Sequence, residues 1–193
     1  ETPPTMDGGV GDVIILGPSS SGGNVVLPGT VLTAADAISV EAHRVGNFGG
    51  DITLGVLASG SGKITVNGDG AVTTDNLTTR SATIRVISSK STITTGDIIS
   101  SGPLGGDVFI AADGDITVGN IDAHGTTEHS GIINIHNTTI GSGSTASITV
   151  NGNILSSSYI KIQTPQAYLP GNTIKITGST TTEAANIVMI AGS

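Results

Sequence analysis

Apolar and polar residues alternate in short stretches along most of this chain. Triplets such as Ile116-Thr117-Val118 and Ile148-Thr149-Val150 have apolar residues at both ends and a polar residue between them. Because successive side chains of a β-strand point to opposite faces, each triplet predicts a short strand with its apolar ends inward. No segment sustains the apolar stripe of a helix. The pattern therefore predicts an all-β chain.

The triplets form two series that recur with a mean period of about 27 residues. The first series begins at Ile52, Ile84, Val108, Ile133, Ile160 and Ile187, and the second at Ile38, Ile64, Ile93, Ile116, Ile148 and Ile174. A third, weaker strand follows the second series at Ile98, Ile121 and Ile154. The connections are too short and polar for crossover helices. We therefore expect a parallel β-helix, or β-solenoid, with about six coils of roughly 27 residues.

The repeat divides the chain into two parts. Residues 37–193 contain the solenoid repeats, whereas strand-like stretches in residues 1–36 lie off the period and predict an irregular N-terminal coil or cap. Larger excursions at the corners are expected at 77–81, 126–130 and 165–172. At the other corners, Gly-Gly, Asn-Gly, Gly-Ser and Asp-Gly pairs are expected to supply positive φ angles.

Composition narrows the possible functions. The chain has 193 residues, with two Phe, two Tyr and no Trp, so Ile and Val must fill its core. Its net charge is −8 with only seven Lys and Arg, which argues against binding to nucleic acid. Without cysteine there is no disulfide or thiolate metal site, and no apolar run is long enough for a transmembrane helix. Because it starts at Glu1 without a leader, we interpret it as a processed chain or an excised segment.

Several Gly-Asp phrases resemble those of a known repeat family. Gly-Gly-Asp-Ile-Thr-Leu at 49–54, Gly-Gly-Asp-Val-Phe-Ile at 105–110 and Gly-Asp-Ile-Thr-Val-Gly-Asn-Ile-Asp-Ala at 114–123 are similar to filamentous-haemagglutinin-like repeats of bacterial two-partner secretion exoproteins, with cyanobacterial members the most similar. The resemblance covers about residues 37–193. It implies a right-handed parallel β-helix, export through the outer membrane, and an adhesive or structural role at the cell surface.

One polar loop contains candidate catalytic or metal-binding residues. Asp122, His124, Glu128 and His129 lie close together in the sequence, and imidazole with carboxylate suits zinc or acid–base catalysis. The alternative is a solvated polar loop, because the spacing matches no known ligand motif. We expect no cofactor. The alternative to an absence of cofactors is calcium bound at Gly68-Asp69-Gly70 and Asp113-Gly114-Asp115. Aspartate in such sequences more often forms turns by hydrogen bonding to its own backbone.

A column of threonines is also expected on one face. Thr65, Thr94, Thr117 and Thr149 should stack outward, and flat threonine arrays on solenoids can bind ice. The alternative is cross-strand pairing that stabilises the ladder.

The leading functional hypothesis is a non-catalytic, secreted structural or adhesive module that assembles end to end into a surface filament. Self-association is expected at the apolar C-terminal strand, through Ile187, Val188, Met189 and Ile190. Surface glycans or other cells are further expected partners. Two alternatives remain: a polysaccharide-active β-helix enzyme, and a carbohydrate- or ice-binding solenoid face.

Overall fold

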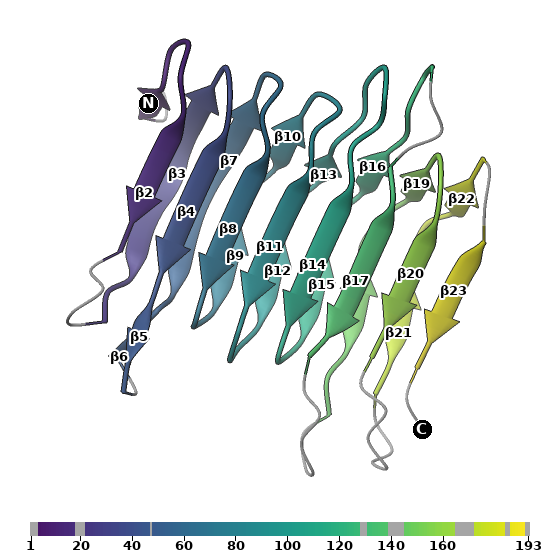
Figure 1. Ribbon diagram of the computed structural model, residues 1–193. Helices are drawn as coiled ribbons and strands as arrows, with labels where there is room; N and C mark the ends of the chain where they lie inside the picture. Colours follow the sequence, from purple (N-terminus) through teal and green to yellow (C-terminus); the bar gives the residue numbers. More distant parts are fainter. Residues whose placement is uncertain are drawn as a thin grey trace.

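A computed structural model of the chain describes residues 4–17, 22–46, 48–127, 131–138, 145–164, 172–183 and 186–191. Every regular element in these ranges is a β-strand, and nearly all strands pair in parallel with the next coil. The coils stack along one axis from the N-terminal to the C-terminal end (Figure 1). This confirms the predicted parallel β-solenoid of about 6 turns. No helix in the described part of the chain is long and apolar enough to span a membrane.

The strands form three faces. Face 1 contains the first parts of β3 (Val25–Ala34) and β7 (Ile52–Ser59), then β9 (Val72–Thr74), β12 (Ile93–Thr95), β15 (Ile116–Val118), β18 (Ile148–Val150) and β21 (Ile174–Ile176). Face 2 contains β1 (Thr5–Asp7), the second parts of β3 and β7, then β10 (Leu77–Thr79), β13 (Ile98–Ile99), β16 (Ile121–Ala123), β19 (Ile154–Ser156) and β22 (Thr180–Thr182). Face 3 contains β2 (Val13–Leu16), β4 (Ile38–Ala42), β8 (Ile64–Gly68), β11 (Ile84–Ser88), β14 (Val108–Ala112), β17 (Ile133–Asn137), β20 (Ile160–Gln163) and β23 (Ile187–Ile190). A short antiparallel ribbon of β5 (Arg44–Val45) and β6 (Phe48–Gly49) follows β4.

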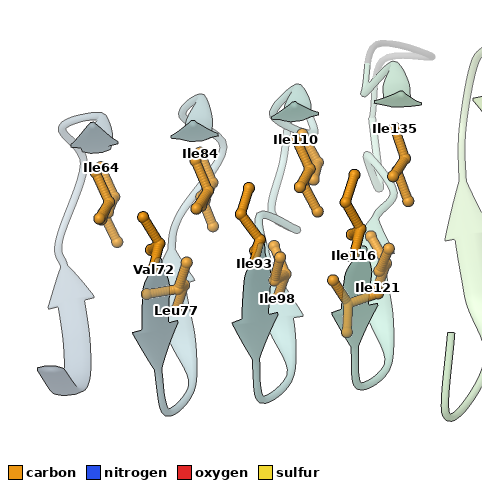
Figure 2. Packing of buried hydrophobic residues seen from close by; sticks show 14 of the residues in the cluster. Ile64, Val72, Leu77, Ile84, Ile93, Ile98, Ile110, Ile116, Ile121 and Ile135 are labelled. Carbon is orange, nitrogen blue, oxygen red and sulfur yellow. The ribbon is translucent and has the colours of Figure 1, made fainter. Parts of the chain in front are cut away.

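Columns of aliphatic side chains fill the interior. Side chains of faces 1 and 2 point toward those of face 3 (Figure 2). Ile64 and Ile84 of face 3, and Ile93 and Ile116 of face 1, are at most 1% exposed. The buried cluster in the described part of the chain consists of Val, Leu, Ile and Ala. Each fully buried branched side chain stabilises the fold by roughly 1.5–3 kcal/mol, so stacking alone can replace an aromatic core.

Small hydroxyl residues complete the interior where face 2 ends. Ser59, Thr79, Ser100 and Ser156 are buried at corresponding positions, and each donates a hydrogen bond to a backbone carbonyl of a corner loop. Buried carbonyls need such partners. The apolar columns therefore end in a polar column at this corner.

A second polar ladder follows the corner between faces 1 and 2. The side-chain oxygens of Asn76, Asp97, Asn120 and Asn153 each accept the backbone N–H of the equivalent residue one coil further on, at 2.8–2.9 Å. The preceding glycines of the later coils, Gly96, Gly119, Gly152 and Gly178, lie against those oxygens, so a Cβ would collide with them.

Positive φ angles were expected at the Asn-Gly and Gly-Ser pairs, which include Gly152 and Gly178, and this expectation was wrong at this corner. None of the four has a positive φ; they are required for close approach to the neighbouring coil. Positive φ angles do occur at Gly49, Gly50 and Gly105, within the Gly-Gly pairs.

The sequence assigned several strands to the wrong face. Ile52 pairs with Val72, 20 residues along, and not within the series that contains Ile84. Ile38 and Ile64 instead share face 3 with Ile84. The reason is strand β9, whose second inward residue is the buried Thr74 rather than an apolar one. The predicted excursion at 77–81 contains strand β10, so that expectation was also wrong. The excursions at 126–130 and 165–172 lie largely outside the described residues.

The same reassignment changes the threonine column. Thr65 lies on face 3, between Ser39 and Arg85. The outward threonines of face 1 pair from coil to coil in the order Thr53, Thr73, Thr94, Thr117 and Thr149, followed by Lys175. The column is therefore one residue wide and five coils long.

The described part of residues 1–36 joins the same ladders. Strand β2 pairs with β4 on face 3, β1 pairs with β3 on face 2, and β3 pairs with β7. The register shifts between Leu27 and Val31, where Pro28 and Gly29 lie and Gly29 has φ 65°. These residues form a coil with an irregular corner.

Candidate functional site

The structure brings Asp122 and His124 together at the end of β16. Asp122 Oδ1 lies 2.6 Å from His124 Nδ1 and also accepts the His124 backbone N–H at 3.2 Å. Both side chains are about one-third exposed. The carboxylate therefore orients an accessible imidazole, which is an arrangement suited to proton transfer.

The other two candidates of that loop, Glu128 and His129, lie outside the described residues. In the described ranges, no group of three or more His, Cys, Asp or Glu side chains could hold a metal ion. The Asp122–His124 pair is thus a two-residue site as far as the structure describes it.

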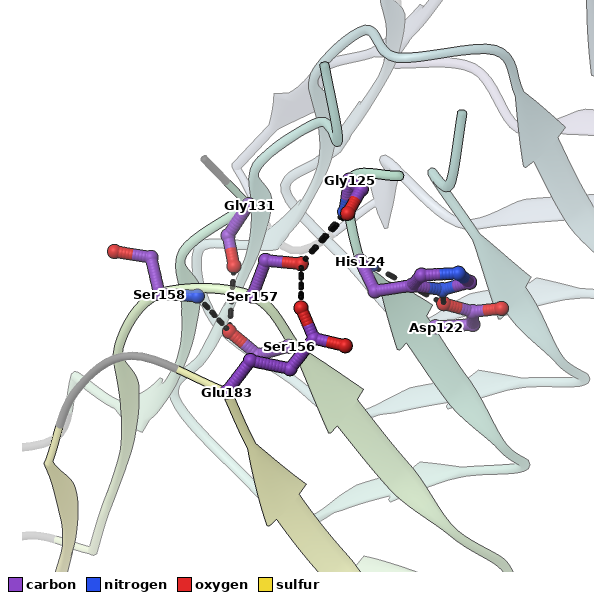
Figure 3. Close-up of polar contacts among 8 residues, drawn as sticks. All are labelled: Asp122, His124, Gly125, Gly131, Ser156, Ser157, Ser158 and Glu183. Carbon is purple, nitrogen blue, oxygen red and sulfur yellow. Dashed lines mark hydrogen bonds and ion pairs between the residues drawn. The ribbon is translucent and has the colours of Figure 1, made fainter. Parts of the chain in front are cut away.

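Beside this pair, a buried serine joins three coils. Ser157 Oγ accepts the Gly125 N–H at 2.7 Å and lies 3.3 Å from both Gly125 O and Glu183 Oε2. Figure 3 shows the His124 ring directed toward Asp122, whereas Ser157 is directed toward Gly125 and Glu183. Ser157 is fully buried. Its hydroxyl therefore stabilises the stack and is not placed as an accessible nucleophile.

The calcium candidates act as caps for neighbouring backbone. Asp69 Oδ2 accepts the Arg44 N–H at 2.9 Å, and Asp115 Oδ1 accepts the Ser147 N–H at 2.7 Å. His43 lies 3.7 Å from both Asp69 and Glu41 and is largely exposed. These contacts account for the aspartates as turn and ladder residues.

Sequence reasoning missed a group of side chains on face 3. Arg85 and Phe109 are outward neighbours on β11 and β14, and the Arg85 guanidinium lies 5.4 Å from the Phe109 ring centroid. The His136 ring packs edge-on against Phe109, with centroids 5.2 Å apart. Burial, and then the charge of Lys161 on the next coil, lower the pKa of His136 below 6.5. Only the register between coils reveals this group, because its members are far apart in sequence.

The C-terminal strand presents two different sets of side chains. Ile187 and Met189 continue the inward columns of Ile160 and Ile162, whereas Val188 and Ile190 lie at outward positions. Ile187 is 41% and Met189 43% exposed, although Ile160 and Ile162 are fully buried. The four predicted self-assembly residues therefore divide between the end of the solenoid and its side.

No protein family, curated protein or solved structure that was compared with this chain matches it.

Proposed function

We propose that this chain is a non-catalytic structural and adhesive module of the cell exterior, which extends by end-to-end stacking of its coils. The observation that carries this proposal is the open end of the inward columns at Ile187 and Met189. In the preceding coils, the equivalent side chains are buried by the next coil. A further coil placed on β23 would bury these two residues and pair the edge strand.

The opposite end offers a matching surface. Strand β2 is the other edge of face 3, and its Val13 and Ile15 begin the same two inward columns. On face 2, Met6 of β1 is 44% exposed. Stacking of a second copy would place Ile187 over Val13 and Met189 over Ile15. Such a head-to-tail contact does not close on itself, so it generates a filament.

The side-chain chemistry of the coils supports a structural role. The asparagine ladder, the inward hydroxyls and the Ser157 contacts all join one coil to the next. The extracellular placement rests on the resemblance of the Gly-Asp phrases to exported repeat proteins. An antibody against the folded chain should label intact source cells, and labelling only after lysis would contradict this placement.

Electron microscopy of purified residues 1–193 tests the assembly. We expect rods whose lengths are multiples of the single particle and increase with protein concentration. Single particles at every concentration would overturn the proposed stacking.

The Asp122–His124 pair favours one alternative, a polysaccharide-active enzyme. An imidazole held by a carboxylate could act as general acid or base. The wild-type chain and Asp122→Asn should both leave acidic and neutral polysaccharides intact if the module is non-catalytic. Cleavage by the wild type that disappears in Asp122→Asn would establish catalysis instead.

A further inference from the structure

The middle coils of face 3 carry cationic and aromatic side chains close together. We name the following five residues the face-3 cluster: Arg85, Phe109, His136, Tyr159 and Lys161. In the ladders, Arg85 pairs with Phe109, and Asn134 lies between Phe109 and Lys161. Arg85, Phe109, His136 and Lys161 occupy outward positions, because the residues on either side of each in its strand are buried. Tyr159 lies just before β20, two residues from Lys161.

The cluster is held together by ring contacts. Phe109 contacts the Arg85 guanidinium on one side and the His136 ring on the other, with an interplanar angle of 72° between the two rings. Such cation–π and edge-on contacts restrict the side chains. Arg85, Phe109 and His136 are therefore restrained before any ligand binds, which lowers the entropy cost of binding at these three residues.

Two residues lie near Lys161 on this face: Tyr159, which belongs to the face-3 cluster, and Asn134, which does not. The Tyr159 carbonyl accepts the Ile133 N–H at 2.8 Å, which fixes its register beside β17 and two residues before Lys161. Asn134 Oδ1 is buried and has no hydrogen-bond partner in the described part of the chain. Phe109 and Tyr159 are both partly exposed. Two of the four aromatic residues of the chain thus lie on one face within a few coils.

The charge of the cluster differs from that of the whole chain. The chain has a net charge of −8, yet Arg85 and Lys161 lie on this face without a carboxylate partner among the described residues. The nearest acidic residue along the strands is Asp107, whose Oδ1 accepts the Ile132 N–H at 2.9 Å. Arg85 and Lys161 are three coils apart, or about 14 Å at the usual strand spacing.

We propose that the face-3 cluster binds an acidic polysaccharide, a proposal that rests on the adhesive function above. An extended sugar chain can lie along the flat face, across the outward positions that Arg85, Phe109 and Lys161 occupy. Arg85 and Lys161 then pair with carboxylate groups of the sugar, since charge-assisted hydrogen bonds are the stronger kind.

Binding can be measured by biolayer interferometry at low salt on three immobilised polymers: polygalacturonate, neutral dextran and single-stranded DNA. We expect the wild-type chain to bind polygalacturonate in preference to the other two. Arg85→Gln and Lys161→Gln should each weaken binding about two- to fivefold, as expected for exposed ion pairs. Phe109→Thr should weaken it by about fivefold, because the Arg85 guanidinium loses the ring that positions it.

Lys175→Gln is the matched control, because it removes the same charge from an exposed position on face 1. It should bind as the wild type does. Equal polygalacturonate binding by the wild type and by the Arg85→Gln/Lys161→Gln double variant would overturn the proposal. So would a wild-type chain that does not bind polygalacturonate, or one that prefers dextran or DNA. Particle lengths in electron microscopy should be unchanged in the cluster variants. If the wild-type chain forms filaments but does not bind polygalacturonate, this inference is refuted while end-to-end stacking remains in place.

Discussion

At the corner between faces 1 and 2, an asparagine or aspartate oxygen in each coil accepts a backbone N–H of the next coil. Asn120, for example, accepts the Asn153 N–H at 2.9 Å. The oxygen can reach this N–H only because a glycine precedes the residue that donates it. The two residues of each Gly-Asn or Gly-Asp pair at this corner therefore have linked roles. The Asn or Asp oxygen accepts a backbone N–H of the next coil, and the glycine leaves room for the corresponding oxygen of the preceding coil.

Substitution of Gly119 tests this account directly. A Cβ at Gly119 would collide with Asp97 Oδ1 and lie 2.9 Å from the Gly96 carbonyl carbon. Gly119→Ala should therefore destabilise the fold by about 1–3 kcal/mol, the usual cost of overpacking. The control is Gly11→Ala, where the nearest atom is 3.8 Å away. Urea unfolding followed by circular dichroism should show a lower midpoint for the first variant only; equal midpoints would contradict the close-approach explanation.

His136 predicts a pH dependence of stability. Burial of its ring, and then the charge of Lys161, lower its pKa in the folded state below the ordinary value of 6.5. The unfolded chain therefore binds a proton more readily, so this contribution to stability is present above pH 6.5 and is lost as pH falls below that value. Between pH 7.5 and pH 5, His136→Gln should lose less stability than the wild type in urea titrations. Identical losses in the wild type and in His136→Gln would refute the prediction.

At the scale of the strand, two inward branched aliphatic residues were enough to reveal most elements from the sequence. Strand β15, with Ile116 and Val118 inward, is an example. Strand β9 was missed because its second inward residue, Thr74, satisfies its hydroxyl with the Asp75 carbonyl at 3.0 Å. A buried threonine with a local acceptor is acceptable in the core, but it carries no apolar signal.

Candidate sites were predictable only where their residues are neighbours in sequence. Asp122 and His124 lie two positions apart at the end of one strand, so their contact could be anticipated. Ser157 and Glu183 lie on different coils, and so do Phe109 and His136. Their contacts depend on coil lengths, which vary from the 20 residues between Ile52 and Val72 to the 33 between Ile121 and Ile154. An error of one strand in this register moves a residue to another face.

The inward and outward positions of one strand should differ sharply in their tolerance to truncation. Ile116 is fully buried between Ile93 and Ile148, so Ile116→Ala should destabilise the fold by about 2–5 kcal/mol. Thr117→Ala, on the outward face of the same strand, should cost less than about 1 kcal/mol. Thermal unfolding of the two variants provides the comparison. Similar costs would mean that this strand does not face the interior as described.

At the scale of the whole molecule, the two ends differ from every coil between them. The interior repeats along one axis, and face 3 runs without a break from β2 to β23 (Figure 1). Among the strands that the structure describes, it is the edge strands that leave inward positions such as Met189 open. Growth along the axis therefore needs no new type of contact, because a second copy would repeat the contacts already present between adjacent coils.

The most direct test of end-to-end stacking compares two substitutions on strand β23. Met189 faces the open end of the interior, whereas Val188 faces outward on the same strand. Sedimentation velocity over a range of concentrations should show large assemblies for the wild type and for Val188→Glu, and single particles for Met189→Glu, with all three proteins folded by circular dichroism. Assembly of Met189→Glu to the same extent as the wild type would contradict the proposal that the coils stack end to end.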